Sequence, residues 1–128
     1  MVTAPATKLL HAELTEQIIG AAFDVHKELG PGFLEKIYET ALTVELARRA
    51  VPFMQQASIK VNYKGLIIGN YIADLLVAGK VICEIKVATD IAEAHEAQSV
   101  AYLKATGIRV ALVLNFGRRS LQFRRLIH

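Results

Sequence analysis

Two opposite charges, Glu84 and Lys86, interrupt the short apolar run at residues 81–87, Val-Ile-Cys-Glu-Ile-Lys-Val. Runs of this length that are rich in Val and Ile are typical of strands, in which alternate side chains share a face. Both charges therefore project from one side of the expected strand. A buried charge is costly to desolvate unless it is paired, hydrogen-bonded or bound to an ion. A carboxylate that holds a divalent cation, beside a lysine that orients a water, is what metal-assisted phosphodiester hydrolysis requires.

A second acid, Asp74, lies in the apolar run just before that strand. If the two strands form a hairpin, the length of the loop decides whether Asp74 and Glu84 share a face. A two-residue loop puts them on opposite faces. A three-residue loop over residues 77–79 pairs Leu76 with Lys80 and places the two acids diagonally on one face, close enough to hold a single ion. The chemistry therefore predicts an odd-length loop or a bulge.

Length and composition narrow the class of protein. A chain of 128 residues is expected to form one domain, residues 1–128, with residues 1–10 as a flexible lead-in. The apolar fraction of 53% excludes a disordered chain, and the formal charge of +3 is compatible with a nucleic-acid partner without requiring one. The single cysteine, Cys83, favours a cytoplasmic protein. No apolar run reaches the ~18 residues that span a membrane.

Hydrophobic periodicity predicts an α/β fold. Apolar positions recur at three- and four-residue intervals in the expected helices and at two-residue intervals in the first expected strand. The expected elements, in chain order, are helices over residues 13–29 and 33–50, strands over 57–63, 66–77 and 81–87, a helix over 91–105, and strands over 109–114 and 121–127. The order ααβββαββ indicates a mixed β-sheet flanked by helices, with one parallel β-α-β crossover.

The spacing of the charged residues resembles a known nuclease signature. Asp74, followed by Glu84 and Lys86 on the next strand, resembles the PD-(D/E)xK motif, with Ala73 in place of the usual proline. Gln98 and Tyr102 lie one helical turn apart and resemble the Gln-x-x-x-Tyr element of the exonuclease-like branch. The resemblance implies a restriction-endonuclease-like core in which the two acids hold magnesium and the lysine serves the attacking water.

A more specific resemblance lies upstream. Residues 32–38, Gly-Phe-Leu-Glu-Lys-Ile-Tyr, match the Gly-x-x-Glu-x-x-Tyr (GxxExxY) motif for which a family of small bacterial and archaeal proteins is named. Other segments that resemble this family are residues 25–32, 63–65, 95–98, 102–107 and 115–117. The resemblance spans about residues 14–126, and the family is generally classed as PD-(D/E)xK nuclease-like.

The acid of that motif is a candidate third metal ligand. On the second expected helix a sector of about 100° contains Glu35, Tyr38, Glu39 and Leu42. Glu35 can thus reach inward from the first turn while Leu42 anchors the same face in the core. Three carboxylates, with water and phosphate oxygens, suit magnesium or manganese.

Several of these residues also fit purely structural roles. Taken alone, Glu84 and Lys86 fit the exposed face of an edge strand equally well. Tyr38 and Tyr102 fit packing residues with a hydrogen-bonded hydroxyl, whereas Gln98 is expected to bond the lysine or a nucleotide. The basic cluster near the C-terminus fits either a phosphate-binding rim or a charged edge strand that discourages aggregation; its members are Arg118, Arg119, Arg124 and Arg125.

The sequence therefore predicts a nuclease that depends on Mg²⁺ or Mn²⁺ and acts on DNA in preference to RNA. The alternative is a nuclease-like scaffold that binds nucleic acid or a partner protein without cutting. A homodimer is expected, because two protomers of so small a core enclose a duplex better than one. The predicted catalytic residues are Asp74, Glu84, Lys86, Gln98 and Tyr102, and the predicted metal ligands are Glu35, Asp74 and Glu84.

Overall fold

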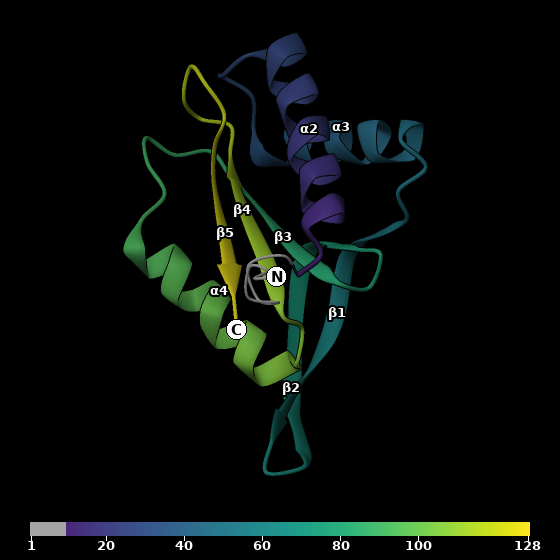
Figure 1. The fold of residues 1–128 in the computed structure, drawn as a ribbon. Helices are drawn as coiled ribbons and strands as arrows, with labels where there is room; N and C mark the ends of the chain where they lie inside the picture. The colour runs from purple at the N-terminus through teal and green to yellow at the C-terminus, as the bar shows by residue number, and fades with distance from the viewer. Residues whose placement is uncertain (1–9) are drawn as a thin grey trace, which may run out of the picture.

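The predicted order of elements, ααβββαββ, is confirmed in a computed structural model that describes residues 10–128 (Figure 1). The expected flexible lead-in lies outside the described residues except for Leu10. The elements are helices α2 (Ala12–Leu29) and α3 (Glu35–Arg48), strands β1 (Phe53–Tyr63), β2 (Leu66–Val77) and β3 (Val81–Lys86), helix α4 (Glu93–Thr106), and strands β4 (Val110–Asn115) and β5 (Gln122–Ile127).

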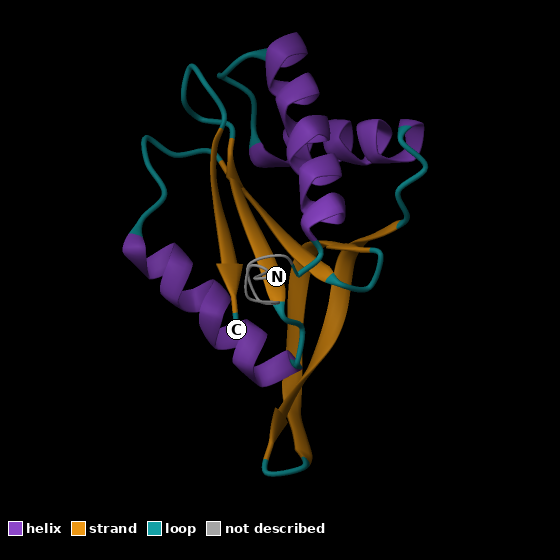
Figure 2. Cartoon of the chain, viewed as in Figure 1, coloured by secondary structure: helices purple, strands orange, loops and turns teal. Residues whose placement is uncertain are grey.

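The five strands form one mixed sheet in the order β1-β2-β3-β4-β5 (Figure 2). Strands β3 and β4 are parallel and joined through α4, as predicted, and the other neighbours are antiparallel. Because β3 and β4 run in the same direction, their last residues, Lys86 and Asn115, pair side by side at one end of the sheet. Polar groups that follow either strand therefore meet at this end.

The helices cover opposite faces of the sheet. The larger core lies between the sheet and helices α2 and α3, and a smaller one lies under α4. Val81, Cys83 and Ile85 of β3 enter the larger core, whereas Ile82 enters the smaller one. Because strand side chains alternate, Glu84 belongs to the α4 face and Cys83 points away from it, as predicted. None of the helices within residues 10–128 is long and apolar enough to cross a bilayer.

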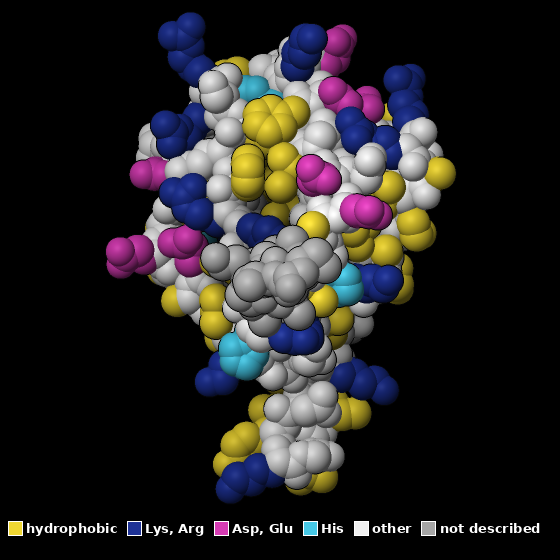
Figure 3. All heavy atoms as spheres, in the orientation of Figure 1, with side chains coloured by type: hydrophobic (Ala, Val, Ile, Leu, Met, Phe, Trp, Pro, Cys, Tyr) yellow, Lys and Arg dark blue, Asp and Glu magenta, His cyan; other side chains and the backbone are white. Residues whose placement is uncertain are grey.

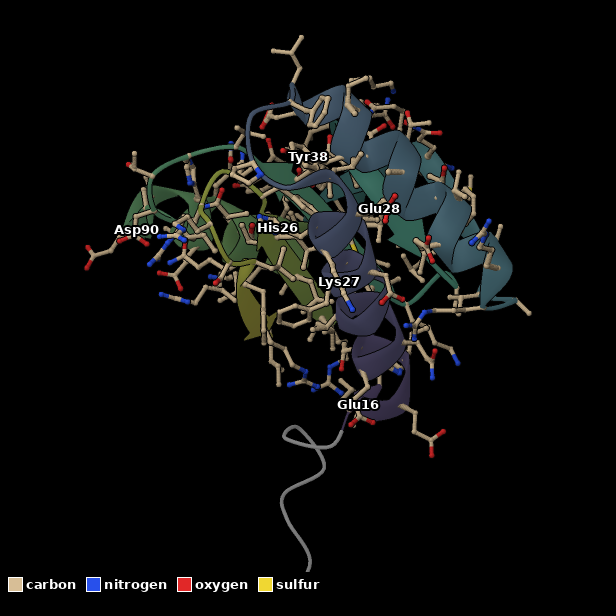
Figure 4. The ribbon with its side chains drawn as sticks, turned by 90° about the horizontal axis from the view of Figure 1, so that it is seen from above. Glu16, His26, Lys27, Glu28, Tyr38 and Asp90 are labelled. Carbon is tan, nitrogen blue, oxygen red and sulfur yellow. The ribbon has the colours of Figure 1, made fainter. Side chains whose placement is uncertain are left out.

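Tyr38 fixes the corner between α2 and α3. Its hydroxyl donates to the Gly30 carbonyl at 2.6 Å and accepts from the Phe33 N–H at 3.2 Å. Its ring stacks on Phe116 with centroids 4.7 Å apart, and both side chains are fully buried. Figure 4 shows Tyr38 above the sheet at the start of α3. The tyrosine of the Gly-x-x-Glu-x-x-Tyr motif is thus a packing residue with a hydrogen-bonded hydroxyl, as the sequence favoured.

The β2–β3 hairpin has the odd-length loop that the chemistry predicted. Val77 pairs with Val81, so the loop has three residues, 78–80, and both Ala78 (φ 53°) and Gly79 (φ 68°) are left-handed. The predicted pairing of Leu76 with residue 80 is wrong, because Leu76 pairs with Ile82. Val77 is fully buried and therefore stays in the ladder instead of opening the loop.

The β1–β2 hairpin projects well beyond the helices (Figure 1). Its turn, Lys64-Gly65, has positive φ at both residues (48° and 82°), as a tight two-residue hairpin requires. Large apolar side chains are exposed at and near its tip: Tyr63, Leu66, Ile67 and Ile68. Strand β1 is also an edge of the sheet, so one side of its backbone is unpaired by any strand among the described residues. This arm is the most apolar projection of the described chain.

Candidate active site

The structure brings Asp74 and Glu84 together. The β2–β3 ladder ends at Leu75 and Cys83, and the next residue of each strand is an acid, Asp74 in β2 and Glu84 in β3, close enough for the charge of Asp74 to act on Glu84. The Asp74 carboxylate accepts a hydrogen bond from the Ile85 N–H at 2.8 Å, which takes the place of a ladder bond. Both acids are partly buried. The two carboxylates predicted to share a site therefore lie near each other on adjacent strands.

A local irregularity in β2 produces this arrangement. Tyr71 and Ala73 pack on the α4 face, whereas Leu75 packs on the opposite face, although strict alternation would put all three on one side. The change of face occurs at Asp74. Across from it in β1, Gln56 has a positive φ of 50°, a conformation that non-glycine residues seldom adopt. The two strands are thus distorted together at the acid.

Tyr71 orients Glu84, and the sequence gives no signal for this role. Its hydroxyl donates to Glu84 Oε1, and its ring stacks on Tyr102 of α4 with centroids 3.8 Å apart. Regular alternation places residues 71 and 74 on opposite faces, so only the irregularity at Asp74 brings Tyr71 to the Glu84 side. Burial, and then the neighbouring Glu84, raises the pKa of the Tyr71 hydroxyl, which keeps it a donor. Tyr102 therefore reaches the site through Tyr71.

Glu84 carries the strongest perturbation among the acids of the site. Burial raises its pKa from the ordinary 4.5 to about 7, and the charge of Asp74 raises it as well. The Tyr71 hydroxyl and Lys86 act in the opposite direction without cancelling the effect. A carboxylate that titrates near neutrality beside a second acid gains from a cation that neutralises both.

The α3 acid that faces the site is Glu39. Its carboxylate accepts hydrogen bonds from Gln55 at 2.6 Å, Gln56 at 2.9 Å and Lys36 at 2.9 Å, and Gln56 also reaches Asp74 at 3.4 Å. Burial acts to raise the pKa of Glu39, but these hydrogen bonds outweigh it and hold that pKa below its ordinary value. Sequence reasoning placed Glu39 on the inward sector of the helix without assigning it a role.

The other predicted site residues differ in their exposure to solvent. Glu35 is exposed at the first residue of α3, one turn before Glu39, and its role as a metal ligand stays a prediction. Lys86 is partly buried at the end of β3, on the same face as Glu84. Gln98 is exposed on α4 and forms no side-chain hydrogen bond within residues 10–128, so it is accessible to a substrate.

Comparison with known proteins identifies the superfamily of the chain. The family model of the PD-(D/E)XK nuclease superfamily matches residues 12–126. The chain belongs to this superfamily. The crystal structure of SSO0001 is similar, with a TM-score of 0.55 and 15% sequence identity, over 97% of this chain and 62% of that one. An identity this low shows a shared fold alone, and this chain spans less than two thirds of SSO0001. A search of curated proteins finds no match.

Superfamily nucleases typically use divalent metal ions, and the donor set of this member fits one. Magnesium is commonly held by one or two carboxylates, with waters and substrate phosphates filling its octahedron. Asp74 and Glu84 supply two. No group of three His, Cys, Asp or Glu side chains suited to a metal ion occurs within residues 10–128. The fit is therefore to a two-carboxylate site that substrate oxygens complete.

Asn115 locks the chain that follows Lys86. It is fully buried at the end of β4, and its Oδ1 accepts from the N–H groups of Ala88 and Gly117, each at 3.0 Å. Its Nδ2 donates to the Ala88 carbonyl and to Gln122 Oε1, also at 3.0 Å. A Cβ on Gly117 would lie 2.5 Å from the Ala88 nitrogen, so only glycine fits. No spacing in the sequence indicates that Asn115 joins these two segments.

Replacing Glu84 tests the perturbed carboxyl. Because folding raises this pKa from 4.5 to about 7, the folded protein holds a proton that the unfolded chain releases, and stability falls as the pH rises through this window. The metal-free protein should lose up to roughly 3 kcal/mol of unfolding free energy between pH 4.5 and 7.5 from this group alone. In urea titrations over the same pH range, Glu84→Gln should lack this loss of unfolding free energy. The matched exposed variant Glu16→Gln should retain it, and equal pH dependence in all three proteins would refute the assignment.

Proposed function

We propose that this protein is a nuclease that hydrolyses phosphodiester bonds of DNA with the help of Mg²⁺ or Mn²⁺. The observation that carries the proposal is the closeness of Asp74, whose carboxylate accepts from the Ile85 N–H, to the neighbouring acid Glu84, with Lys86 two residues further along the same face. Membership of the nuclease superfamily supports phosphodiester hydrolysis as the reaction class. The mild positive charge of the chain supports a nucleic-acid substrate.

Each residue of the site has a part in this reaction. Asp74 and Glu84 would hold the cation, which when bound polarises the phosphate and offsets its charge. Lys86 would orient or deprotonate the attacking water and stabilise the negative charge that develops on the phosphorane. Tyr71, backed by Tyr102, keeps the Glu84 carboxylate aimed across the strands. Gln98, exposed on α4, would contact the substrate strand.

Lys86→Ala tests the reaction. The variant should lower metal-dependent cleavage about 100-fold or more, because a group that stabilises transition-state charge is lost while the fold is kept. The assay is a panel of single- and double-stranded DNA and RNA with Mg²⁺ or Mn²⁺, with DNA the preferred substrate. Lys104→Ala, which removes an exposed lysine from the last turn of α4, is the charge-matched control and should cleave as wild type does. Cleavage by Lys86→Ala at the wild-type rate would refute the proposed role of Lys86 in the reaction.

The two acids of α3 can be separated by metal affinity. Isothermal titration with Mn²⁺ should show affinity reduced by about tenfold in Glu39→Gln, because Glu39 positions the Gln56 side chain that meets Asp74. Glu35→Gln should stay within about twofold of wild type, because Glu35 is exposed. The reverse order would instead support the Gly-x-x-Glu-x-x-Tyr motif acid as the third ligand.

The second candidate is a nuclease-like scaffold that binds nucleic acid or a partner protein without cutting. The observation that favours it is the presence of only two converging carboxylates within residues 10–128. The Mn²⁺ titration also separates these functions: binding that is weak and unchanged by Asp74→Asn supports the scaffold.

The fully buried thiol of Cys83 supports the proposed cytoplasmic location, because a reducing compartment leaves it free.

We further infer that two copies associate through the β1–β2 arm. Its exposed apolar tip and the open edge of β1 are surfaces that a second copy can bury. Light scattering at about 50 µM should give twice the 14.1 kDa chain mass, a concentration chosen as typical for weak dimers. Ile67→Glu should yield the monomer, whereas Val44→Glu, at a similarly exposed position of α3, should not. A monomeric wild-type protein would contradict the inference.

A further inference from the structure

We propose that the β4–β5 loop and the start of β5 form a phosphate-binding surface that holds a nucleic-acid strand beside the carboxylate pair. Residues 118–124 line a hollow of about 510 Å³, and three of the seven are Arg118, Arg119 and Arg124. The choice of nucleic acid as the ligand rests on the proposed function. Figure 3 shows Lys and Arg side chains along the upper left of the molecule, the side where Figure 1 places this loop.

The arginines retain donors for a ligand. Arg118 lies 3.8 Å from Asp90 and Arg124 lies 3.5 Å from Glu96, which is long beside the 2.7–2.9 Å of charge-assisted hydrogen bonds. Both side chains are about half exposed, at 49% and 46%. Arg119 is exposed and forms no ion pair within residues 10–128. A planar guanidinium with free N–H groups matches the oxygens of a phosphate.

The register of the sheet sets the distance from these arginines to the acids. Glu84 pairs with Val113 of β4, which pairs with Arg124 of β5, so Arg124 shares a row and a face with Glu84. Two strand spacings amount to roughly 10 Å. That length is the axial rise of about three nucleotides in one strand of a duplex. A strand held by Arg124 thus lies within about three nucleotides of Glu84, and it would pass around this row rather than over it, because Val113 between the two is fully buried.

The backbone of the loop is anchored on both sides, so the positions from which the arginine side chains extend are fixed before a ligand arrives. On one side Asn115 ties Gly117 and Gln122 to the segment that follows Lys86. On the other side the buried His26 of α2 donates from Nε2 to the Arg118 carbonyl at 2.7 Å. His26 and Asp90 mark the two flanks in Figure 4. A surface fixed in this way loses little conformational entropy on binding. A merely protective edge strand has no need of such anchors.

The test is the salt dependence of binding without metal, so that no cleavage interferes. Fluorescence anisotropy of a labelled 20-nucleotide single strand in EDTA gives Kd between 50 and 300 mM salt, a range in which counterion release is measurable. Arg118→Ala/Arg119→Ala should weaken binding about tenfold and flatten the log–log slope by about 1.4, the value for two lost contacts to a single strand. Lys27→Ala/Arg48→Ala removes two charges from the exposed outer side of α2 and α3 and should leave the slope unchanged.

Thermal unfolding of the exposed arginine variant should match wild type, so that a change in Kd reports binding. An unchanged slope, an equal change in the control pair, or no binding by wild type would each overturn this inference. Wild-type cleavage together with an unchanged slope would reject this surface and leave the nuclease intact. Arginine-dependent binding without cleavage by any metal would reject the nuclease and keep the surface.

Discussion

The burial of the Glu84 carboxyl beside a second acid, Asp74, is the constraint on which the rest of the site depends. Two acids that lie near each other on adjacent strands, both partly shielded from water, cannot ionise together without cost. The burial-raised pKa of Glu84 records this cost in the metal-free protein. The fold maintains the arrangement with the Ile85 N–H bond to Asp74 and the Tyr71 bond to Glu84. A divalent cation bound between the two carboxylates would neutralise both, and the cost that it removes would add to its binding affinity.

The parallel pairing of β3 and β4 connects the carboxylate site to the neighbouring strands of the sheet. It brings the end of β4 beside Lys86, where Asn115 joins the segment after the lysine to the arginine-bearing loop. This pairing and these hydrogen bonds fix the positions of the carboxylates, the lysine and the basic loop relative to one another. Among the described strand residues other than glycine, positive φ is limited to Gln56, across from Asp74; β1 and β2 shift register again at Val61/Asn62, whereas β3 and β4 pair without interruption. Strain at the acid is therefore supported by a well-packed sheet.

The sequence predicts well whatever depends on local chemistry. The amphipathic pattern of α2, the Lys64-Gly65 turn and the odd β2–β3 loop are determined by residues near one another in the chain. It predicts poorly what depends on how elements pack. Tyr71 reaches Glu84 only because β2 changes face at Asp74, and Glu35 and Glu39 share a helix face but differ in depth because of the way α3 meets β1. Neither fact is encoded in a spacing.

The most direct measurement is a ¹³C NMR titration of the Glu84 side-chain carboxyl in metal-free protein. We expect a pKa of about 7, lowered in Asp74→Asn but still above 4.5, because burial is the larger cause and the Asp74 charge the smaller. Saturating Mg²⁺ should displace the proton and move the titration to lower pH. A pKa near 4.5 that neither Asp74→Asn nor Mg²⁺ changes would contradict the paired-carboxylate site.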